Sequence, residues 1–392
     1  MIHFVTAFEV ERRDEMSSET YDVVIVGGGI VGAACAYELT QRAVRVAIVE
    51  RELVGGGATA AGMGHIVVMD DSDAQFALTR YSQKLWQELR PELPAEVEYE
   101  QCGTIWVAAD QEEMSEVARK STFYGSHNVP VEVLSGSDLE QLEPNLRRGM
   151  AGGLLVVEDA VLYPPCAAQY LIERVLEKCA TLYSGTTAAH IGRGEVHLSN
   201  STTLSGATIV NATGAWSSML TPGIDVKKRK GHLVITDRYP GFVRHQLVEL
   251  GYLKSAHSLT ADSIAFNVQP RQTGQLLIGS SRQYGAEHKE VDQEILRRML
   301  QRAQEYLPSI GETVAIRSWT GFRAATADKL PLIGPAPGDP SIYLATGHEG
   351  LGITTSLATG KLIADQITGS SSAIAIEPYL PSRVMTPEHA HA

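Results

Sequence analysis

Residues 21–50, YDVVIVGGGIVGAACAYELTQRAVRVAIVE, decide the fold of this chain. Residues 23–26 form a short apolar, β-branched run, which is typical of a strand buried on both faces of a parallel sheet. The run leads into G-x-G-x-x-G at residues 27–32, and apolar residues at helical spacing follow. Residues 44–49 then read as a second strand that ends at Glu50. The stretch therefore predicts a strand, a glycine turn, a helix and a second strand.

Each residue type in this unit has a physical task in binding a dinucleotide. Gly27 permits a tight turn, Gly29 lets the backbone approach a pyrophosphate, and Gly32 lets the helix lie close to the sheet. The helix N-terminus offers N–H groups and the positive end of its dipole to a diphosphate. Glu50 can accept hydrogen bonds from the adenosine ribose hydroxyls, and it would repel a 2′-phosphate. The unit thus predicts a bound dinucleotide and disfavours NADP.

Composition limits the function classes. The 392 residues suffice for two or three domains, and 44% of them are hydrophobic, which is ample for a sizeable core. A formal net charge of −13 argues against a nucleic-acid partner. The four cysteines have no C-x-x-C spacing, which indicates reduced thiols of a cytoplasmic protein and no metal site. No apolar run is long enough for a transmembrane helix, while peripheral membrane association stays open.

The pattern of predicted elements indicates an α/β protein with two interleaved domains. Strands and helices that continue the opening unit are expected in residues 21–96, 146–226 and 317–370, which would form a Rossmann-like domain. Strand-rich segments at 97–145 and 227–316 predict a discontinuous α+β domain with a mainly antiparallel sheet. Within it, Ser137 is expected to cap a helix, with Glu140 three residues later. Residues 1–20 and 371–392 are expected to be a disordered extension and a disordered tail.

Three later segments carry a family likeness. They are GGGATAAGMGH (residues 55–65), VNATGAWSS (210–218) and GFRAATADKLPLIG (321–334). Together with the opening unit, in this order, they make the chain resemble the D-amino-acid oxidase and glycine oxidase family of flavoproteins, over residues 21–367. The last segment is the most specific, because it matches a long ordered pattern in which the arginine, here Arg323, binds the substrate carboxylate.

The resemblance implies FAD as the cofactor, with a Rossmann-like FAD-binding domain and a separate substrate domain. Similar flavoproteins of the sarcosine oxidase type attach the flavin through a cysteine in the C-terminal part. No cysteine lies beyond Cys179 here, so the resemblance implies a non-covalent flavin. The residues expected to bind FAD come from the opening unit, the glycine-rich loop, the Ala-Thr-Gly segment and the C-terminal glycines. They are Gly27, Gly29, Ile30, Val31, Gly32, Glu50, Arg51, Gly57, Ala58, Thr59, Gly62, Met63, Gly64, Thr213, Gly214, Trp216, Gly321, Gly347, Gly350, Leu351, Gly352 and Ile353.

The implied activity is oxidation of a small amino or imino acid at its Cα–N bond by hydride transfer to flavin N5. Arg323 suits the carboxylate, since a guanidinium pairs with it bidentately. His348 is a candidate catalytic residue beside the C-terminal glycines, and Tyr252 and Arg282 are candidates for the roof of the substrate pocket. The alternative for each is a packing or surface role.

The segment GHEGLGITTS (residues 347–356) resembles D-amino-acid and D-hydroxyproline dehydrogenases, so D-proline or 4-hydroxy-D-proline is the expected substrate. Glycine or sarcosine is the alternative, favoured by Ala-Ala-Gly-Met at residues 60–63 and disfavoured by Glu349. A non-catalytic flavin-binding subunit of a complex is the alternative of another class. Oxygen or a quinone would accept the electrons, and subunit contacts or a homo-oligomer stay open.

Overall fold

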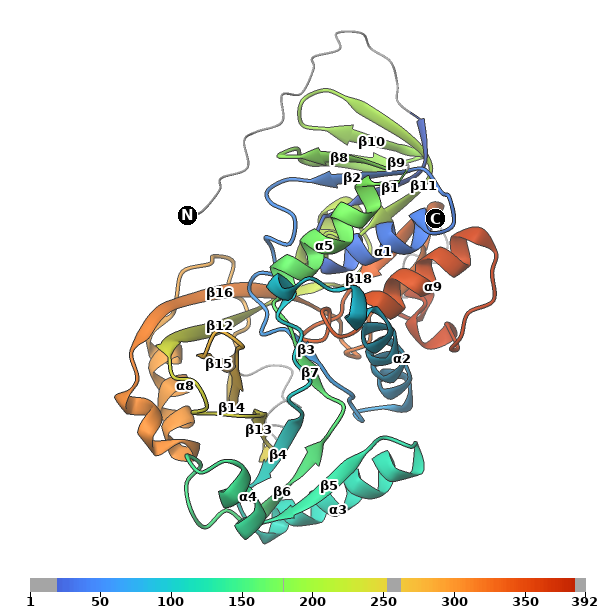
Figure 1. Cartoon of the computed structure of the whole chain (residues 1–392). Coiled ribbons are helices and arrows are strands. Elements are labelled where there is room, and N and C mark those ends of the chain that lie inside the picture. Colours follow the sequence, from blue (N-terminus) through green and yellow to red (C-terminus); the bar gives the residue numbers. More distant parts are fainter. Residues whose placement is uncertain (1–19, 179, 252–261, 385–392) are drawn as a thin grey trace.

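The structure is a computed structural model that describes residues 20–178, 180–251 and 262–384. The described strands form two large sheets and one two-stranded ribbon. Figure 1 shows one large sheet in the upper part of the molecule and the other in the lower part. Within the described residues, no helix has the length and apolar character needed to cross a membrane.

Eight described strands form the first sheet, and the opening unit lies at its centre. The strands are β1 (Thr20–Val26), β2 (Val46–Glu50), β8 (Ala180–Ser184), β9 (Ala188–Gly192), β10 (Glu195–Leu198), β11 (Thr203–Asn211), β17 (Leu332–Ala336) and β18 (Asp339–Thr346). Their order is β17-β18-β11-β1-β2-β8, with β9 and β10 attached through β11. β1 is parallel to both β11 and β2, which confirms the buried parallel strand predicted at residues 23–26.

Helices cover one face of this sheet: α1 (Ile30–Thr40), α5 (Pro164–Leu176) and α9 (Ser356–Thr368). The glycine turn leads straight into α1, which is buried on nearly all sides. A helix that is apolar all round is stable only inside a protein, between other elements. The opposite face of the sheet packs against the strands β9 and β10 and against Phe322.

The second sheet is mainly antiparallel, as the sequence predicted. Its strands are β4 (Thr104–Ala108), β5 (Val131–Ser135), β6 (Gly152–Val156), β12 (Lys227–Arg238), β13 (Gln246–Glu249), β14 (Ser263–Pro270), β15 (Gln275–Arg282) and β16 (Ala315–Ala325). Their order is β16-β12-β15-β14-β13-β4-β6-β5, and only the β4–β13 pair is parallel among these pairings. One face packs against α8 (Gln293–Tyr306) and α4 (Gly136–Leu142), and part of the other face packs against α3 (Gln111–Ser126).

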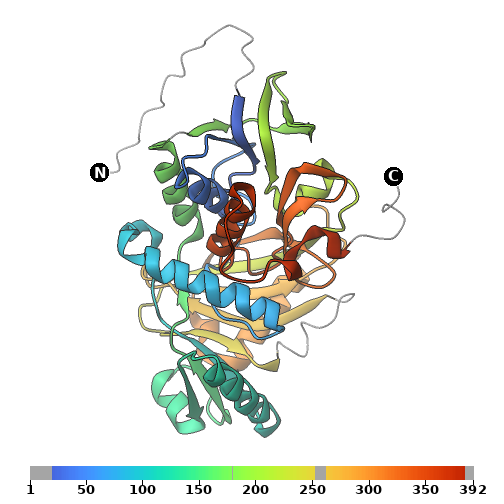
Figure 2. The ribbon, with the colours of Figure 1, turned by 90° about the vertical axis from the view of Figure 1, so that its right-hand side faces the viewer.

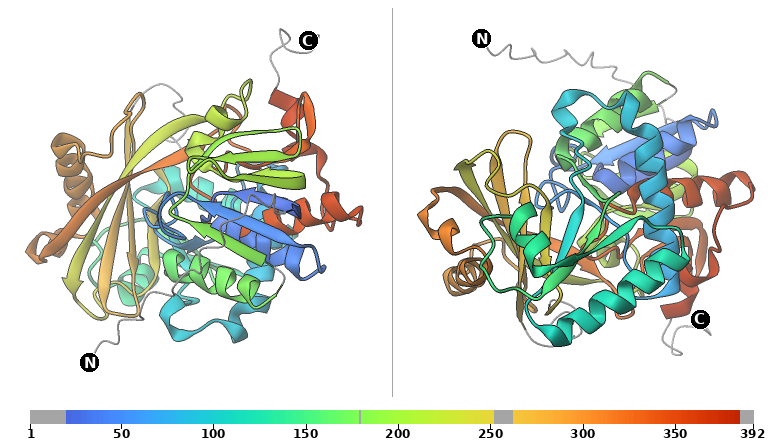
Figure 3. Two further views of the ribbon diagram at one scale, coloured as in Figure 1. Left: turned by 90° about the horizontal axis from the view of Figure 1, so that it is seen from above. Right: turned by 60° about the horizontal axis from the view of Figure 1, so that its bottom comes forward.

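A helix and a short ribbon connect the two sheets. α2 (Asp73–Leu89) crosses the boundary between them, as Figure 2 shows. β3 (His65–Ile66) pairs with β7 (Ala160–Val161) in the ribbon. The left view of Figure 3 shows the second sheet standing beside the first, with its long strands β12 and β16 curving toward the first sheet.

Several boundaries differ from the sequence prediction. β6 was assigned to the FAD-binding segments and pairs instead with β4 and β5 in the second sheet, and β16 likewise pairs with β12 there. Pairing partners are set by tertiary contacts that a strand's own composition does not encode. The predicted cap at Ser137 was wrong: Ser135 caps α4 in a capping box with Asp138.

The predicted disordered tail was also wrong for the part that the structure describes. Short 3₁₀ helices span Glu377–Tyr379 and Pro381–Val384. Tyr379 is 1% exposed, and its hydroxyl donates a hydrogen bond to the Ala74 carbonyl over 2.6 Å. A single buried aromatic anchors a segment whose overall composition is typical of disorder.

Candidate functional site

The glycine turn between β1 and α1 requires glycine for two different reasons. Gly27 has φ +112°, a backbone conformation that side chains rarely adopt. A Cβ on Gly32 would lie 1.9 Å from the Gly27 carbonyl oxygen, so the first helical turn can approach the strand only without one. Gly29 has ordinary backbone angles. A Cβ on Gly29 would lie 3.3 Å from the Thr59 hydroxyl, in the space at the N-terminus of α1.

Two side chains complete this turn. The Thr59 hydroxyl accepts a hydrogen bond from the Ile30 N–H at the start of α1, over 3.0 Å. Its own hydrogen can then be donated to an anion at the helix N-terminus. The Glu50 carboxylate accepts from Gly28 N–H at 2.7 Å and from Glu52 N–H at 2.8 Å, which fixes it at the end of β2. Glu50 is therefore held at the position where the sequence predicts a ribose contact.

The Asn-Ala-Thr-Gly segment forms a rigid turn at the end of β11. Asn211 is fully buried; its amide donates to Ser217 O and Thr221 Oγ1, and its oxygen accepts from both N–H and hydroxyl of Thr213. Gly214 has φ +59°. Its carbonyl accepts a hydrogen bond from Thr346 of β18. The turn thus holds the adjoining backbone against the central cavity.

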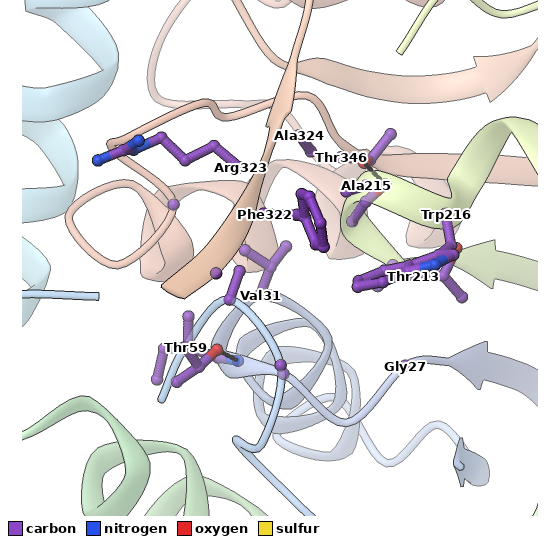
Figure 4. Close-up of a pocket in the computed structure, with 18 of the residues that line it drawn as sticks. Gly27, Val31, Thr59, Thr213, Ala215, Trp216, Phe322, Arg323, Ala324 and Thr346 are labelled. Carbon is purple, nitrogen blue, oxygen red and sulfur yellow. Dashed lines mark hydrogen bonds between the residues drawn. The ribbon is translucent and has the colours of Figure 1, made fainter. Parts of the chain in front are cut away.

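A cavity of about 500 Å³ lies between these segments. Figure 4 shows Thr59, Val31 and Gly27 on one side of it, Thr213 and Trp216 on another, and Arg323 extending away from Trp216. The guanidinium of Arg51 lies 4.3 Å from the centre of the Trp216 ring, which brings the two predicted contacts together. The glycine turn, the N-terminus of α1, the fixed Glu50 carboxylate and the cavity that they line fit FAD.

Arg323 occupies one end of this cavity. It projects from β16 across the neighbouring strand, where Gly231 pairs with Gly321. A Cβ on Gly231 would lie 2.3 Å from Arg323 Nη1 and 2.7 Å from Cζ, so the guanidinium rests directly on the backbone of β12. Nη1 donates to the Ser281 carbonyl over 2.9 Å. These contacts orient the guanidinium at the end of the cavity, where a carboxylate could pair with it.

Glu349 lies beside Arg323 and belongs to a buried charged cluster. Its backbone has φ +50°, and its N–H donates to the Ala324 carbonyl over 2.7 Å. Arg229 donates a hydrogen bond to Oε1, and Arg282 Nε lies 3.3 Å from the same oxygen. Among the described residues Oε2 has no hydrogen-bond partner although it is buried. The sequence prediction treated Glu349 only as a departure from glycine oxidase, so this role was missed.

Two histidines line the cavity in their neutral form. Burial lowers the pKa of His348 to about 3 and the pKa of His65 to about 4. His348 Nε2 is hydrogen-bonded to Thr359 of α9 over 3.0 Å, which favours a positioning role over acid–base catalysis. His65 Nε2 is buried without a hydrogen-bond partner among the residues that the structure describes.

A second cavity of about 110 Å³ adjoins the first, and the two share lining residues that include His65, Asn267 and Glu349. It is bounded by strands of the second sheet and by the segment after β18. No group of three or more His, Cys, Asp or Glu side chains suited to a metal ion occurs in the described ranges, and no metal was predicted.

The structure brings most predicted site residues to the first cavity. Its lining includes Gly27, Gly29, Ile30, Val31, Glu50, Arg51, Gly57, Ala58, Thr59, Gly62, Met63, Gly64, Thr213, Gly214, Trp216, Gly321, Arg323, His348, Gly350, Gly352 and Ile353. Arg282 and Leu351 line the second cavity instead. Gly32 and Gly347 line neither and act through the backbone. Tyr252 lies outside the described residues.

Other lining residues were missed by the sequence prediction. Thr186 and Thr187 come from the turn between β8 and β9, Ala188 and Ala189 begin β9, and Asn267 comes from β14. Neither segment has a glycine pattern or charge that marks a binding site. Their place depends on how the sheets meet, which is not encoded locally.

The fold and the site together define a dinucleotide-binding protein with an arginine at the end of the cofactor cavity. A family model described as DAO, FAD dependent oxidoreductase, matches residues 22–366. The chain belongs to the DAO family of FAD-dependent oxidoreductases. This confirms the predicted family, the fold class, FAD as cofactor and the class of an oxidoreductase acting on CH–NH or CH–NH2 donors.

Individual relatives are similar over nearly the whole chain. Glycine oxidase of Geobacillus kaustophilus is 28% identical over 378 residues, covering 93% of this chain and 97% of the relative. The hydrogen cyanide synthase subunit HcnC of Pseudomonas aeruginosa is 27% identical, with the same coverage of both chains. The crystal structure of the Geobacillus kaustophilus glycine oxidase has a TM-score of 0.84 at 28% identity and covers 94% of this chain and all of its own.

A further solved structure supports the fold alone. The L-proline dehydrogenase from P. horikoshii has a TM-score of 0.82, covering 94% of this chain and 98% of its own. Its identity to this chain is 22%.

Proposed function

We propose that this protein oxidises a small D-imino acid, D-proline or 4-hydroxy-D-proline, at its Cα–N bond. The observation that carries the proposal is Arg323, which the Ser281 carbonyl and the backbone of Gly231 hold at the end of the FAD cavity. When bound, non-covalent FAD supplies the hydride acceptor at N5. The protein's own task is to hold the substrate's α-carbon against the flavin and to exclude water.

Arg323 would bind the substrate carboxylate and so fix the position of the α-carbon. A charge-assisted bidentate pair also fixes the plane of the carboxylate, and contacts to the rest of the substrate would then set the orientation of the Cα–H bond. The two neutral histidines next to this end of the cavity add no positive charge beside the substrate nitrogen. Uncharged imidazoles suit a substrate whose amine must be unprotonated when hydride leaves its Cα.

Glycine or sarcosine is the second candidate, because several relatives are glycine oxidases. The adjoining cavity of about 110 Å³ favours a larger substrate, since glycine has no side chain to fill it. A flavin-binding subunit of a complex is a candidate of another class, and one relative is named as a subunit of a synthase.

Turnover with a dye acceptor tests the proposal directly. D-proline, both C4 epimers of 4-hydroxy-D-proline, glycine, sarcosine and D-alanine would be compared by kcat/KM. We expect the cyclic imino acids to exceed glycine and sarcosine. A preference for glycine or sarcosine would replace the proposed substrate, and no turnover of any compound would support the non-catalytic subunit. Anaerobic reduction by substrate followed by exposure to air then separates oxygen from a quinone as acceptor.

Arg323→Ala tests the carboxylate role. Loss of two charge-assisted hydrogen bonds should lower kcat/KM by roughly 100-fold or more, mainly through KM. Arg323→Lys keeps the charge and should recover part of the loss, since an ammonium cannot pair in the same planar way. The flavin absorbance spectrum of both variants reports whether FAD is still bound. Unchanged kinetics in the Ala variant would remove Arg323 from the substrate site.

A further inference from the structure

The cavity beside Glu349 is built on one face of three neighbouring strands. The strand register pairs Gln246 of β13 with Thr104 of β4, and Val248 of β13 with both Trp106 of β4 and Asn267 of β14. Because side chains alternate along a strand, these five residues share one face of the sheet, and all five line the cavity. The intervening residues, such as Ile105, Leu247 and Phe266, form the apolar core on the other face.

Several polar atoms on this face lack partners. Gln246 and Trp106 are 3% and 4% exposed. Gln246 Oε1, Trp106 Nε1 and Asn267 Oδ1 are buried and have no hydrogen-bond partner among the described residues. The same is true of Glu349 Oε2, which lines the cavity from the segment after β18. Leaving one such atom unsatisfied costs about 1–3 kcal/mol. A sheet face that collects several of them around one cavity is suited to a polar ligand group.

The numbers of hydrogen-bond donors and acceptors among these unpartnered atoms indicate the chemistry of the ligand group. Three of these four atoms are oxygens that only accept hydrogen bonds, and the indole Nε1 only donates one. A hydroxyl matches both, because it donates one hydrogen bond and accepts others. The charged residues lining the cavity are Asp71, Glu349, Arg282 and Lys329, two of each sign, which favours a neutral group.

We infer that this cavity is a subsite for a hydroxyl-bearing substituent of the substrate. It adjoins the FAD cavity at Glu349, next to the strand that bears Arg323. A substrate held by its carboxylate at Arg323 places its ring substituent toward Glu349, Gln246, Asn267 and Trp106. The inference rests on the proposed function and deepens it: the hydroxylated imino acid is the preferred substrate, ahead of D-proline.

The test is a ratio of specificities. For the wild-type holoenzyme, kcat/KM would be measured with D-proline and with each C4 epimer of 4-hydroxy-D-proline, and with the acyclic pair D-alanine and D-serine. We expect the hydroxylated member of a pair to be preferred about tenfold or more, and one C4 epimer to exceed the other. One well-made hydrogen bond to a buried group is sufficient for about a tenfold effect.

Two variants assign the preference to this face. Trp106→Phe removes the indole N–H and keeps an aromatic ring, and Gln246→Met removes the amide at similar length. Each should lower the ratio of kcat/KM for hydroxylated over unsubstituted substrate about tenfold. Trp319→Phe is the matched control: its Nε1 is also buried and unpartnered in the described part of the chain, but Trp319 lines neither cavity. It should leave the ratio unchanged.

The possible failures are distinct. A wild-type enzyme that oxidises D-proline but does not prefer the hydroxylated substrate overturns the subsite and leaves the proposed function standing. The same holds if Trp106→Phe and Gln246→Met lower both members of a pair equally. Absence of turnover with every amino and imino acid overturns the proposed function itself, together with the subsite.

Discussion

Gly231 is a residue whose missing side chain shapes the site. It lies under the guanidinium of Arg323, and the three nearest atoms that a Cβ would meet, Nη1, Cζ and Nη2, all belong to the end of that flexible side chain. A substitution here should therefore move Arg323 and leave the strand pairing intact. A clash between a new Cβ and the guanidinium should change how Arg323 orients the substrate more than it changes folding stability, since the arginine side chain can change its conformation at little cost.

For Gly231→Ala we expect KM for the imino acid to rise about tenfold or more, with little change in the melting temperature. The displaced guanidinium can no longer present its planar edge to the carboxylate, and tenfold corresponds to about 1.4 kcal/mol. Gly125→Ala is the control, because Gly125 is exposed in α3 and a Cβ there meets nothing within 4 Å. If Gly231→Ala leaves KM unchanged, Arg323 does not bind the carboxylate in the orientation described.

Asp159 is a buried acid that makes stability depend on pH. Its Oδ1 accepts hydrogen bonds from Val68 N–H at 3.2 Å and from Gln83 Nε2 at 2.9 Å. Burial raises its pKa from 3.8 to about 7. Between about pH 4 and pH 7 the folded state therefore keeps a proton that the unfolded state loses, so this group's contribution to stability falls as pH rises through that window.

Asp159→Asn should reverse this loss. The amide oxygen can accept the same two hydrogen bonds, and the side chain no longer ionises. We expect the free energy of unfolding of the variant to exceed that of the wild type by an amount that grows from pH 5 to pH 8, on the order of 3 kcal/mol. Urea denaturation at the two pH values measures it. An equal difference at both would mean that Asp159 does not titrate in this window.

At the level of elements, α1 and α9 are joined by an unusually close approach. A Cβ on Gly360 of α9 would lie 2.5 Å from the backbone oxygen of Ala34 in α1. Backbone cannot move aside as a side-chain tip can. The contact sets the distance between the last helix and the helix whose N-terminus faces the cofactor cavity, so its integrity matters for both stability and FAD binding.

Gly360→Ala should separate the two helices and lower the free energy of unfolding by about 1–3 kcal/mol. FAD affinity, measured by fluorescence of released flavin, should fall as well. Gly125→Ala places the same methyl group on the open surface of another helix and should be neutral or slightly stabilising. A Gly360→Ala protein as stable as the wild type would contradict the close helix contact.

At the scale of the whole molecule, the last described residues pack against the core and against the segment after β16. Tyr379 is buried in the core cluster of the first sheet's helices, and Arg383 pairs with Asp328 over 2.7 Å and donates to the Leu330 carbonyl. These contacts attach the end of the chain to the segment that directly follows Arg323 on β16. These residues thus help to hold the segment next to Arg323 in place.

Removing residues 371–392 should lower stability by more than the single change Tyr379→Phe. The Phe variant loses one hydrogen bond, about 0.5–1.5 kcal/mol, whereas the truncation also removes the buried ring, about 3–5 kcal/mol for a large aromatic. Thermal unfolding of both proteins measures the difference. A truncated protein as stable as the wild type would show that this segment contributes nothing to the folded state.

The sequence by itself determined the dinucleotide cradle and the family. Gly27, Gly32 and Glu50 are local requirements: a positive φ, a close helix approach and a carboxylate at the end of a strand are all set within residues 21–50. The segment that contains Arg323 could also be recognised from the sequence, since its residues form one continuous pattern that ends at Gly334. Local steric and hydrogen-bonding needs leave a local sequence signature.

Only the tertiary structure decided what surrounds the Arg323 end of the cavity. β6 and β16 pair with strands of the second sheet, and the Tyr379 side chain is buried, because strand pairing and side-chain burial depend on partners that are distant in the sequence. The cap of α4 is Ser135. Gln246, Trp106 and Asn267 come from three strands whose order no spacing reveals. These residues line one cavity because the strands are neighbours in register, and that register is a property of the assembled sheet.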